Sequence, residues 1–186
     1  MKRHIAAVVG LSGVGKSTLL TQVAATVTFQ YLQASALIRE ERQSANSHLT
    51  IDQLRSFDLD ENQVLLVNAF RRVGNPAGLI VLDAHAAIEQ NETLILVRPD
   101  VFQAIGINSM VYLTEESAEI ARRRLSDTKR QRQIKSAEQI NCAQEQVLQH
   151  AKDICTALSI SISIFRSSDH LAVTHFLQSI REGSVD

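Results

Sequence analysis

A glycine-rich stretch near the N-terminus constrains most strongly what this chain can fold into. Residues 10–17 read Gly-Leu-Ser-Gly-Val-Gly-Lys-Ser and match the pattern G-x-x-x-x-G-K-[ST] at every position. The apolar run over residues 5–9 that precedes them is typical of a strand buried on both faces. A helix-compatible segment follows, and its apolar stripe consists of Leu19, Leu20, Val23 and Ala24. The sequence therefore predicts a strand, a tight loop and a helix in succession.

This order of elements is what a phosphate-binding loop requires. Glycines in the loop let backbone N–H groups approach an anion closely, and the start of the helix attracts negative charge. We expect Lys16 to reach the β- and γ-phosphates of ATP and the Ser17 hydroxyl to bind Mg²⁺. A glycine-rich turn that only caps a helix is the alternative, and the strand–loop–helix context disfavours it. The residues expected to contact ATP are Gly10, Leu11, Ser12, Gly13, Val14, Gly15, Lys16, Ser17 and Thr18.

Composition and charge narrow the class of protein. The 186 residues are enough for one domain with a full core, and 45% of them are hydrophobic. A net charge of −1 gives no overall field that would attract nucleic acid or a membrane surface. No apolar run approaches the roughly 18 residues that span a bilayer, and a cleaved signal peptide would remove the first strand. Cys142 and Cys155 fit neither a disulfide nor a metal motif, so we expect reduced thiols in a cytoplasmic protein.

The rest of the chain alternates between strand and helix patterns, which predicts one α/β domain around a parallel sheet. Further strands are expected over 29–33, 79–83, 109–113 and 160–165, and residues 93–97 fit either a strand or a buried loop. Ser35 and Asp60 are expected to cap helices, and Pro99 is expected to start a short one. The helix after Asp60 is expected to present an apolar face made of Val64, Leu65, Val67 and Phe70.

Asp83 is the first candidate outside the loop. It ends an apolar strand, at the edge where open parallel sheets bind ligands. A carboxylate there can hold Mg²⁺ through water, although a strand-end aspartate can also simply cap a turn. His85, two residues further on, can orient a substrate or a water molecule, or serve only a structural role.

A basic segment over residues 122–132 is the second candidate. Arg124, Arg130 and Arg132 could neutralise the charge that develops on a transferring phosphoryl group. A solvated charged face and a nucleic-acid patch are the alternatives, and the segment lacks the interleaved aromatics of the latter. Arg39 and Arg98 could bind the phosphate of an acceptor by paired hydrogen bonds, although each taken alone is more often a surface arginine.

Together these residues resemble a known family. The phosphate loop, Asp83-Ala84-His85 and the run Arg-Arg-Leu-Ser-Asp-Thr-Lys-Arg-Gln-Arg over 123–132 look like those of archaeal-type adenylate kinases and the wider nucleoside monophosphate kinases. The acceptor region differs, since residues 35–39 read Ser-Ala-Leu-Ile-Arg where common adenylate kinases carry T-G-D-x-L-R.

The resemblance implies a P-loop NTPase three-layer fold with a five-stranded parallel sheet in the order 2-3-1-4-5. It implies that residues 1–186 form a single P-loop kinase domain, with an acceptor-binding helical insertion over about 29–75 and a lid over about 122–135. It implies ATP and Mg²⁺ as cosubstrates, a nucleoside monophosphate such as AMP as the acceptor, and possible homo-oligomers. Lys16, Arg124, Arg130 and Arg132 would be catalytic, and Arg39 would bind the acceptor.

Two alternatives stay open from the sequence. The same kinase chemistry can serve another small-molecule acceptor. A nucleotide-sensing ATPase that acts through a partner protein is the other alternative, and the lid arginines argue against it because a switch often takes its arginine from a partner. A GTPase version is disfavoured because no N-K-x-D motif occurs.

Overall fold

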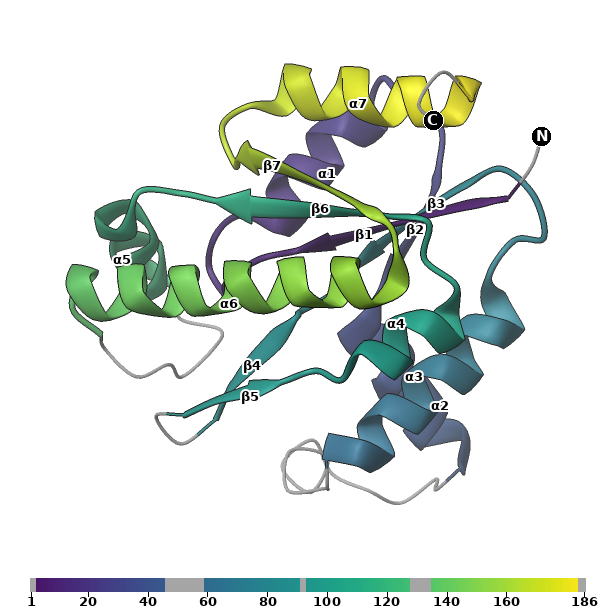
Figure 1. Ribbon diagram of the computed structural model, residues 1–186, viewed down its shortest axis with the longest axis horizontal. Helices are drawn as coiled ribbons and strands as arrows, with labels where there is room; N and C mark the ends of the chain where they lie inside the picture. The colour runs from purple at the N-terminus through teal and green to yellow at the C-terminus, as the bar shows by residue number, and fades with distance from the viewer. Residues whose placement is uncertain (1–2, 46–58, 91–92, 128–134, 184–186) are drawn as a thin grey trace.

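A parallel five-stranded sheet forms the centre of the structure (Figure 1). The computed structural model describes residues 3–45, 59–90, 93–127 and 135–183. All four neighbouring strand pairs of this sheet are parallel, in the order β2-β3-β1-β6-β7. The strands are β1 (His4–Val9), β2 (Gln30–Gln33), β3 (Leu79–Asp83), β6 (Ser109–Thr114) and β7 (Ser161–Arg166).

The α/β class and the parallel five-stranded sheet are confirmed. Counted within this sheet alone, the strands follow the expected order 2-3-1-4-5. The order along the whole chain differs from the prediction because two more strands, β4 (Ala87–Gln90) and β5 (Thr93–Leu96), intervene between β3 and β6. They pair with each other in an antiparallel hairpin and join no strand of the central sheet. The ambiguous segment 93–97 is thus mostly strand, with a partner that the sequence did not suggest.

Helices cover both faces of the sheet (Figure 1). Helices α1 (Lys16–Ala24) and α7 (His170–Glu182) pack together on one face. The other face is covered by α6 (Ala137–Leu158) and α4 (Pro99–Ile105), and α3 (Leu59–Val73) packs on α4 and on α2 (Ala34–Ala45). Helix α5 (Ser117–Ser126) lies beyond the carboxyl ends of the strands, where β6 leads into it.

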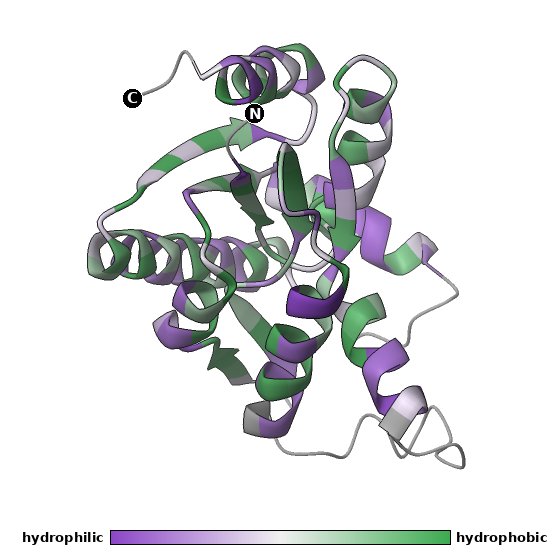
Figure 2. Cartoon of the chain, turned by 90° about the vertical axis from the view of Figure 1, so that its right-hand side faces the viewer, coloured by the Kyte–Doolittle hydropathy of each residue, from purple (hydrophilic) through white to green (hydrophobic). Residues whose placement is uncertain are grey.

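The core lies between these layers, and the continuous apolar strands explain its position. Every residue of β3 is buried, as are all residues of β1 after His4. Figure 2 shows these strands as hydrophobic segments enclosed by helices with alternating hydrophobic and hydrophilic stripes. Strands buried on both faces need apolar side chains at every position, which is the pattern that made them predictable.

Several helix details differ from the prediction. Ser35 lies inside α2, which begins directly at Ala34 after β2, and α3 begins at Leu59, before Asp60. The apolar face of α3 is rotated from the one expected, because Val64 is exposed while Leu66, Ala69 and Phe70 are buried. Ala24 of α1 is likewise exposed. Helix α4 does begin at Pro99, and its neighbour α6 is capped by Ser136, whose hydroxyl accepts from the Gln139 backbone.

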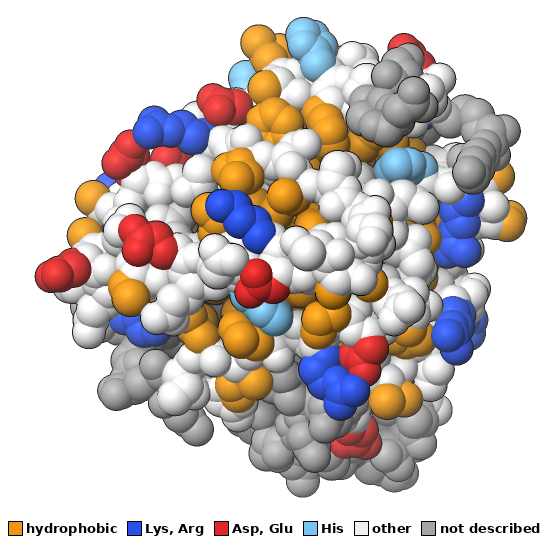
Figure 3. Space-filling model, in the orientation of Figure 1, with side chains coloured by type: hydrophobic (Ala, Val, Ile, Leu, Met, Phe, Trp, Pro, Cys, Tyr) orange, Lys and Arg blue, Asp and Glu red, His pale blue; other side chains and the backbone are white. Residues whose placement is uncertain are grey.

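Within the described ranges, no helix combines the length and the apolar composition that crossing a bilayer requires. On the face drawn in Figure 3, basic and acidic side chains lie interspersed, in keeping with the net charge of −1. The two cysteines are both free, Cys142 exposed and Cys155 buried.

Leu82 offers a test of the packing. It is fully buried in β3, at the centre of the core, so Leu82→Ala should lower the free energy of unfolding by about 2 to 5 kcal/mol. Leu171→Ala, at a position 64% exposed on α7, is the matched control and should change it by less than about 0.5 kcal/mol. Urea unfolding followed by circular dichroism measures both. Equal losses in the two variants would contradict this description of the core.

Candidate active site

The glycine-rich loop lies at the carboxyl end of β1, between β3 and β6. Gly10 begins the loop, and a Cβ there would come within 2.6 Å of the Leu113 carbonyl oxygen on β6. Only a residue without a side chain therefore fits between the two strands. Gly15 has a φ of +108° and stands directly before α1, so its left-handed backbone turns the loop into the helix.

Two arginines of α5 pack onto this loop. Arg124 Nε and Nη2 donate to the Ser12 carbonyl at 2.9 and 2.7 Å, and a Cβ on Gly13 would lie 3.1 Å from Arg124 Cγ. Arg123 Nη1 donates to the Val14 carbonyl at 2.6 Å, and a Cβ on Gly15 would lie 2.8 Å from that nitrogen. The glycines thus leave the space that these guanidinium groups occupy.

Lys16 lies along the same loop and is only 6% exposed. Its Nζ donates to the Gly10 carbonyl at 3.0 Å and lies 3.5 Å from His85 Nδ1. The structure therefore brings His85, which follows β3, against the lysine of the phosphate loop.

Asp83 and Ser17 meet beside the lysine. The Ser17 hydroxyl donates to Asp83 Oδ2 at 2.9 Å, and the Tyr31 hydroxyl of β2 donates to the same oxygen at 2.9 Å. A hydroxyl and a carboxylate are hard oxygen ligands, and Mg²⁺ takes one or two such ligands together with water and substrate phosphates. The described residues contain no cluster of three or more His, Cys, Asp and Glu side chains, so Ser17 and Asp83 fit this sparse type of metal site and no all-protein cage.

Tyr31 stays protonated in this arrangement. Burial raises the pKa of Tyr31 to about 12, and the charge of Asp83 and the hydrogen bond to it act in the same direction. The hydroxyl therefore remains a donor to Asp83 at neutral pH, and together with Ser17 it fixes the position of Oδ2.

A second carboxylate ties the loop to the end of β6. Glu115 accepts from the Ser167 hydroxyl at 2.6 Å and from Arg123 Nη2 at 3.2 Å. Burial alone would raise the pKa of Glu115, but the hydrogen bonds and the charge of Arg123 outweigh it and hold that pKa below its usual value. The carboxylate thus joins α5, the β7–α7 connection and, through Arg123, the phosphate loop.

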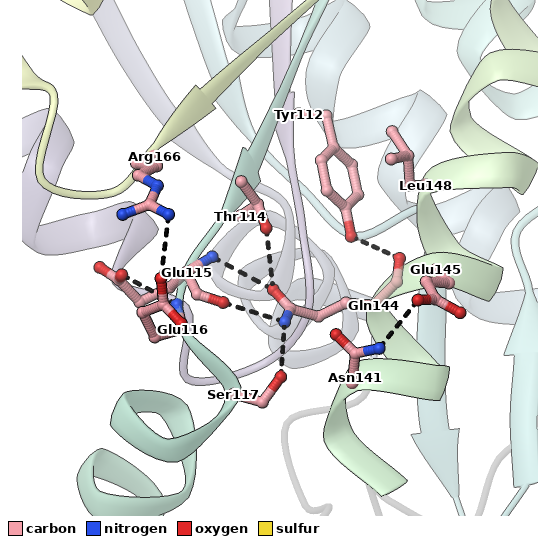
Figure 4. Close-up of a pocket in the computed structure, with 10 residues that line it drawn as sticks. All are labelled: Tyr112, Thr114, Glu115, Glu116, Ser117, Asn141, Gln144, Glu145, Leu148 and Arg166. Carbon is pink, nitrogen blue, oxygen red and sulfur yellow. Dashed lines mark hydrogen bonds and ion pairs between the residues drawn. The ribbon is translucent and has the colours of Figure 1, made fainter. Parts of the chain in front are cut away.

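Gln144 of α6 fixes the backbone that carries Glu115 (Figure 4). Its amide donates to the Glu115 carbonyl at 3.0 Å and accepts from the Glu115 N–H at 3.2 Å. The Tyr112 hydroxyl donates to the Gln144 backbone carbonyl at 2.8 Å. These bonds border a cavity of about 190 Å³ between the end of β6 and α6. The long helix therefore supports the site from behind.

The structure brings together only some of the residues singled out in the sequence. Lys16, Ser17, Asp83, His85 and Arg124 converge on the phosphate loop.

The other candidates do not join this cluster. Arg39 lies exposed on α2, and no partner for it occurs among the described residues. Arg98 forms an ion pair with Asp100 at the start of α4. Arg130 and Arg132 lie outside the described residues.

Four residues at the loop were not assigned a role from the sequence: Tyr31, Glu89, Glu115 and Arg123. Glu89 of β4 contacts Arg124, which is 35 residues away, so no local pattern reveals it. Tyr31 was open to detection, because parallel pairing of β2 with β3 sets Gln33 beside Asp83 and puts Tyr31 on the same side, two residues earlier.

Known proteins resemble this chain in sequence and in fold. The family model described as "AAA domain" matches residues 9–141. The adenylate kinase of Pyrococcus horikoshii is 31% identical over 144 residues, which cover 74% of this chain and 73% of that protein. The adenylate kinase of Thermococcus kodakarensis is 30% identical over 160 residues, with coverage of 83% and 80%.

Among solved structures, a shikimate kinase from Bacteroides thetaiotaomicron superposes with a TM-score of 0.58. The alignment covers 97% of this chain and 98% of that one, at 18% sequence identity. At this identity the likeness concerns the fold alone.

Two half-buried carboxylates, Glu89 and Glu115, predict how stability depends on pH. The pKa values of Glu89 and Glu115 are both below their usual value in the folded protein. A carboxyl group whose pKa is lower in the folded protein than in the unfolded chain stabilises the fold. This contribution is fully present at pH values above the unfolded pKa of about 4.5, and it is lost as the pH falls through the pKa of the folded protein. The free energy of unfolding, measured by urea titration, should therefore decrease as the pH is lowered beneath about 4.5.

The variant Glu115→Gln separates this contribution from the rest. It should be less stable than the parent protein at pH 7 and should lose less of its stability between pH 5 and pH 3. The same slope in both proteins would show that the Glu115 carboxylate does not contribute in the way described.

Proposed function

Because this chain belongs to the AAA domain family, within the P-loop kinases that include archaeal adenylate kinases, we propose that it transfers the γ-phosphoryl group of ATP to AMP. The family makes it a kinase, and AMP as the acceptor is the proposal. The observation that most supports phosphoryl transfer is the position of Arg124. A guanidinium from α5 lies on the Ser12 carbonyl of the phosphate loop, where it can face the same phosphates as Lys16.

On the donor side, we assign ATP binding to residues 10–18. Their backbone N–H groups and the N-terminus of α1 would hold the phosphates. Lys16 and Arg124 would neutralise the charge that spreads over the γ-phosphoryl oxygens as it leaves ADP for a phosphate oxygen of AMP. Arg130 and Arg132 are proposed for the same role on their sequence pattern alone.

Ser17 and Asp83 would hold Mg²⁺, with Tyr31 orienting the carboxylate. When bound, the ion would supply positive charge that offsets the negative charge of the phosphate oxygens. The protein supplies the hydroxyl and the carboxylate, 2.9 Å apart, next to the lysine.

On the acceptor side, we propose that Arg39, Arg98 and His85 bind the monophosphate. The guanidinium of Arg39 is exposed and has no partner within the part of the chain that the structure describes, which supports its role in a paired hydrogen bond to phosphate. His85 is supported by its position 3.5 Å from Lys16. For Arg98 the support is its sequence position alone.

The organisation of the chain is part of the proposal. We treat residues 1–186 as a single kinase domain with an acceptor-binding insertion over about 29–75 and a lid over about 122–135. Homo-oligomers, which the sequence resemblance implies, also stay a prediction.

A different small-molecule acceptor is the second candidate function. It is favoured by the likeness of fold to a shikimate kinase and by the departure of residues 35–39 from the adenylate kinase pattern. A nucleotide-sensing ATPase is less well supported, because Arg124 already supplies an arginine from the same chain.

The acceptor is tested directly by product analysis. Purified protein with Mg²⁺, ATP and AMP should form two ADP per AMP consumed, as measured by anion-exchange chromatography. Lys16→Ala should lower kcat by about 100-fold or more, because it removes a positive charge aimed at the transition state. If ATP binds but AMP and other nucleoside monophosphates remain unphosphorylated, AMP is the wrong acceptor, and shikimate is the next to assay.

Arg39 is tested by steady-state kinetics. If its guanidinium binds the monophosphate, Arg39→Ala should raise KM for AMP by about 10- to 100-fold, because a charge-assisted pair of hydrogen bonds is lost. KM for ATP should stay the same. Arg71→Ala, at an exposed arginine of the neighbouring helix α3, is the control and should change neither constant. An unchanged KM for AMP in the Arg39 variant would remove this residue from the site.

A further inference from the structure

The β4–β5 hairpin brings one carboxylate to the phosphate loop. Glu89 Oε2 accepts from Arg124 Nη2 at 2.6 Å, and Oε1 accepts from Arg124 Nη1 at 3.2 Å. Lys135, which directly precedes the cap of α6, donates to Oε1 at 2.9 Å. One carboxylate thus joins two cations from different elements, next to the loop.

These contacts fix the orientation of the Arg124 guanidinium. The group has five N–H donors, of which two point to the Ser12 carbonyl and two to the Glu89 carboxylate. The fifth, on Nη1, has no partner among the described residues. A planar group held on two sides cannot rotate, so this last N–H keeps a fixed direction beside the loop.

The three side chains of this cluster, Glu89, Arg124 and Lys135, are largely shielded from solvent, which strengthens the attraction between their charges. The side chains of Arg124, Lys135 and Glu89 are 6%, 15% and 18% exposed. Burial alone would raise the pKa of Glu89, but the hydrogen bonds and charges of Arg124 and Lys135 outweigh it and hold that pKa below its usual value. Glu89 is therefore ionised at neutral pH, and losing it would leave two cations without their shared partner.

The hairpin that carries Glu89 begins two residues after His85, beside the phosphate loop. Glu89 lies four residues after His85, which is 3.5 Å from Lys16 Nζ. Ala86 and Ala87, between them, are buried, and the Val97 N–H donates to the Ala86 carbonyl at 2.8 Å. A short, anchored connection of this kind positions a side chain more precisely than a free loop does.

We propose that Glu89 is a positioning residue that holds the Arg124 guanidinium on the phosphate loop, so that Arg124 is pre-oriented toward the γ-phosphate of the donor. This inference rests on the proposed kinase function and adds to it a residue that acts only through Arg124. A purely structural role, in which Glu89 merely fastens the hairpin to α5, predicts a different outcome below.

Nucleotide discrimination tests the proposal without an acceptor. Calorimetry gives the Kd of Mg-ADP and of the non-hydrolysable triphosphate Mg-AMP-PNP. Glu89→Gln keeps the shape of the side chain, but its amide nitrogen is a donor and cannot accept the second of the two bonds from Arg124. It should reduce the preference for the triphosphate by about tenfold while the Kd of ADP stays within about twofold. Glu89→Asp, which keeps the charge, should restore part of that preference.

A double-mutant cycle shows whether the effect passes through Arg124. Arg124→Ala should reduce the preference at least as much as Glu89→Gln, and adding Glu89→Gln to it should cause no further loss. Glu116→Gln, at an exposed carboxylate paired with Arg166, is the matched control and should bind both nucleotides like the parent protein.

Three results would overturn the proposal: an unchanged preference in Glu89→Gln, an equal loss for both nucleotides, or the same further loss when Arg124 is already alanine. The last two outcomes are those of the structural role. Should Glu89→Gln fail to fold, Glu89→Asp and its cycle with Arg124→Ala decide the matter by the same criteria. Since AMP takes no part in these measurements, a failure of the AMP assay would leave this test intact.

Discussion

The contact between helix α5 and the phosphate loop is the interaction on which the rest of the site depends. Arg123 and Arg124 donate to the carbonyl oxygens of Val14 and Ser12, so two guanidinium groups hold the loop through its backbone. Glycines at positions 13 and 15 make this close approach possible, since a Cβ at either would come within about 3 Å of an arginine.

Each arginine is in turn held by carboxylates from other parts of the chain. Glu115, at the end of β6, fixes Arg123, and Glu89, on the β4–β5 hairpin, fixes Arg124. The loop is therefore a meeting point of β1, β6, the hairpin and α5, and its geometry is set before any nucleotide arrives. Such preorganised charge is the main means by which phosphoryl transfer is accelerated, because little covalent chemistry is left for the protein to perform.

The sequence predicted the parts that depend on local patterns and missed those that depend on distant partners. Strand β3 was found at its observed bounds because all five of its residues are apolar or at a strand end. Ser17 and Asp83, each expected to bind Mg²⁺, lie within hydrogen-bond distance of each other, and their metal-binding role stays a prediction. Glu89 escaped notice because its partners lie 35 and 46 residues away. The caps expected at Ser35 and Asp60 were wrong because neighbouring elements set where those helices begin, which local propensity cannot register.

The central claim is that the loop ending at Lys16 and the arginine of α5 grip the same phosphate chain. It is tested most directly by a crystal structure with a bisubstrate compound, two adenosines joined by five phosphates. The account predicts phosphates along residues 10–17, with Lys16 and Arg124 both within hydrogen-bond distance of them and the second adenosine near Arg39. Phosphates bound away from this loop, or bound to it while Arg124 faces elsewhere, would contradict the account.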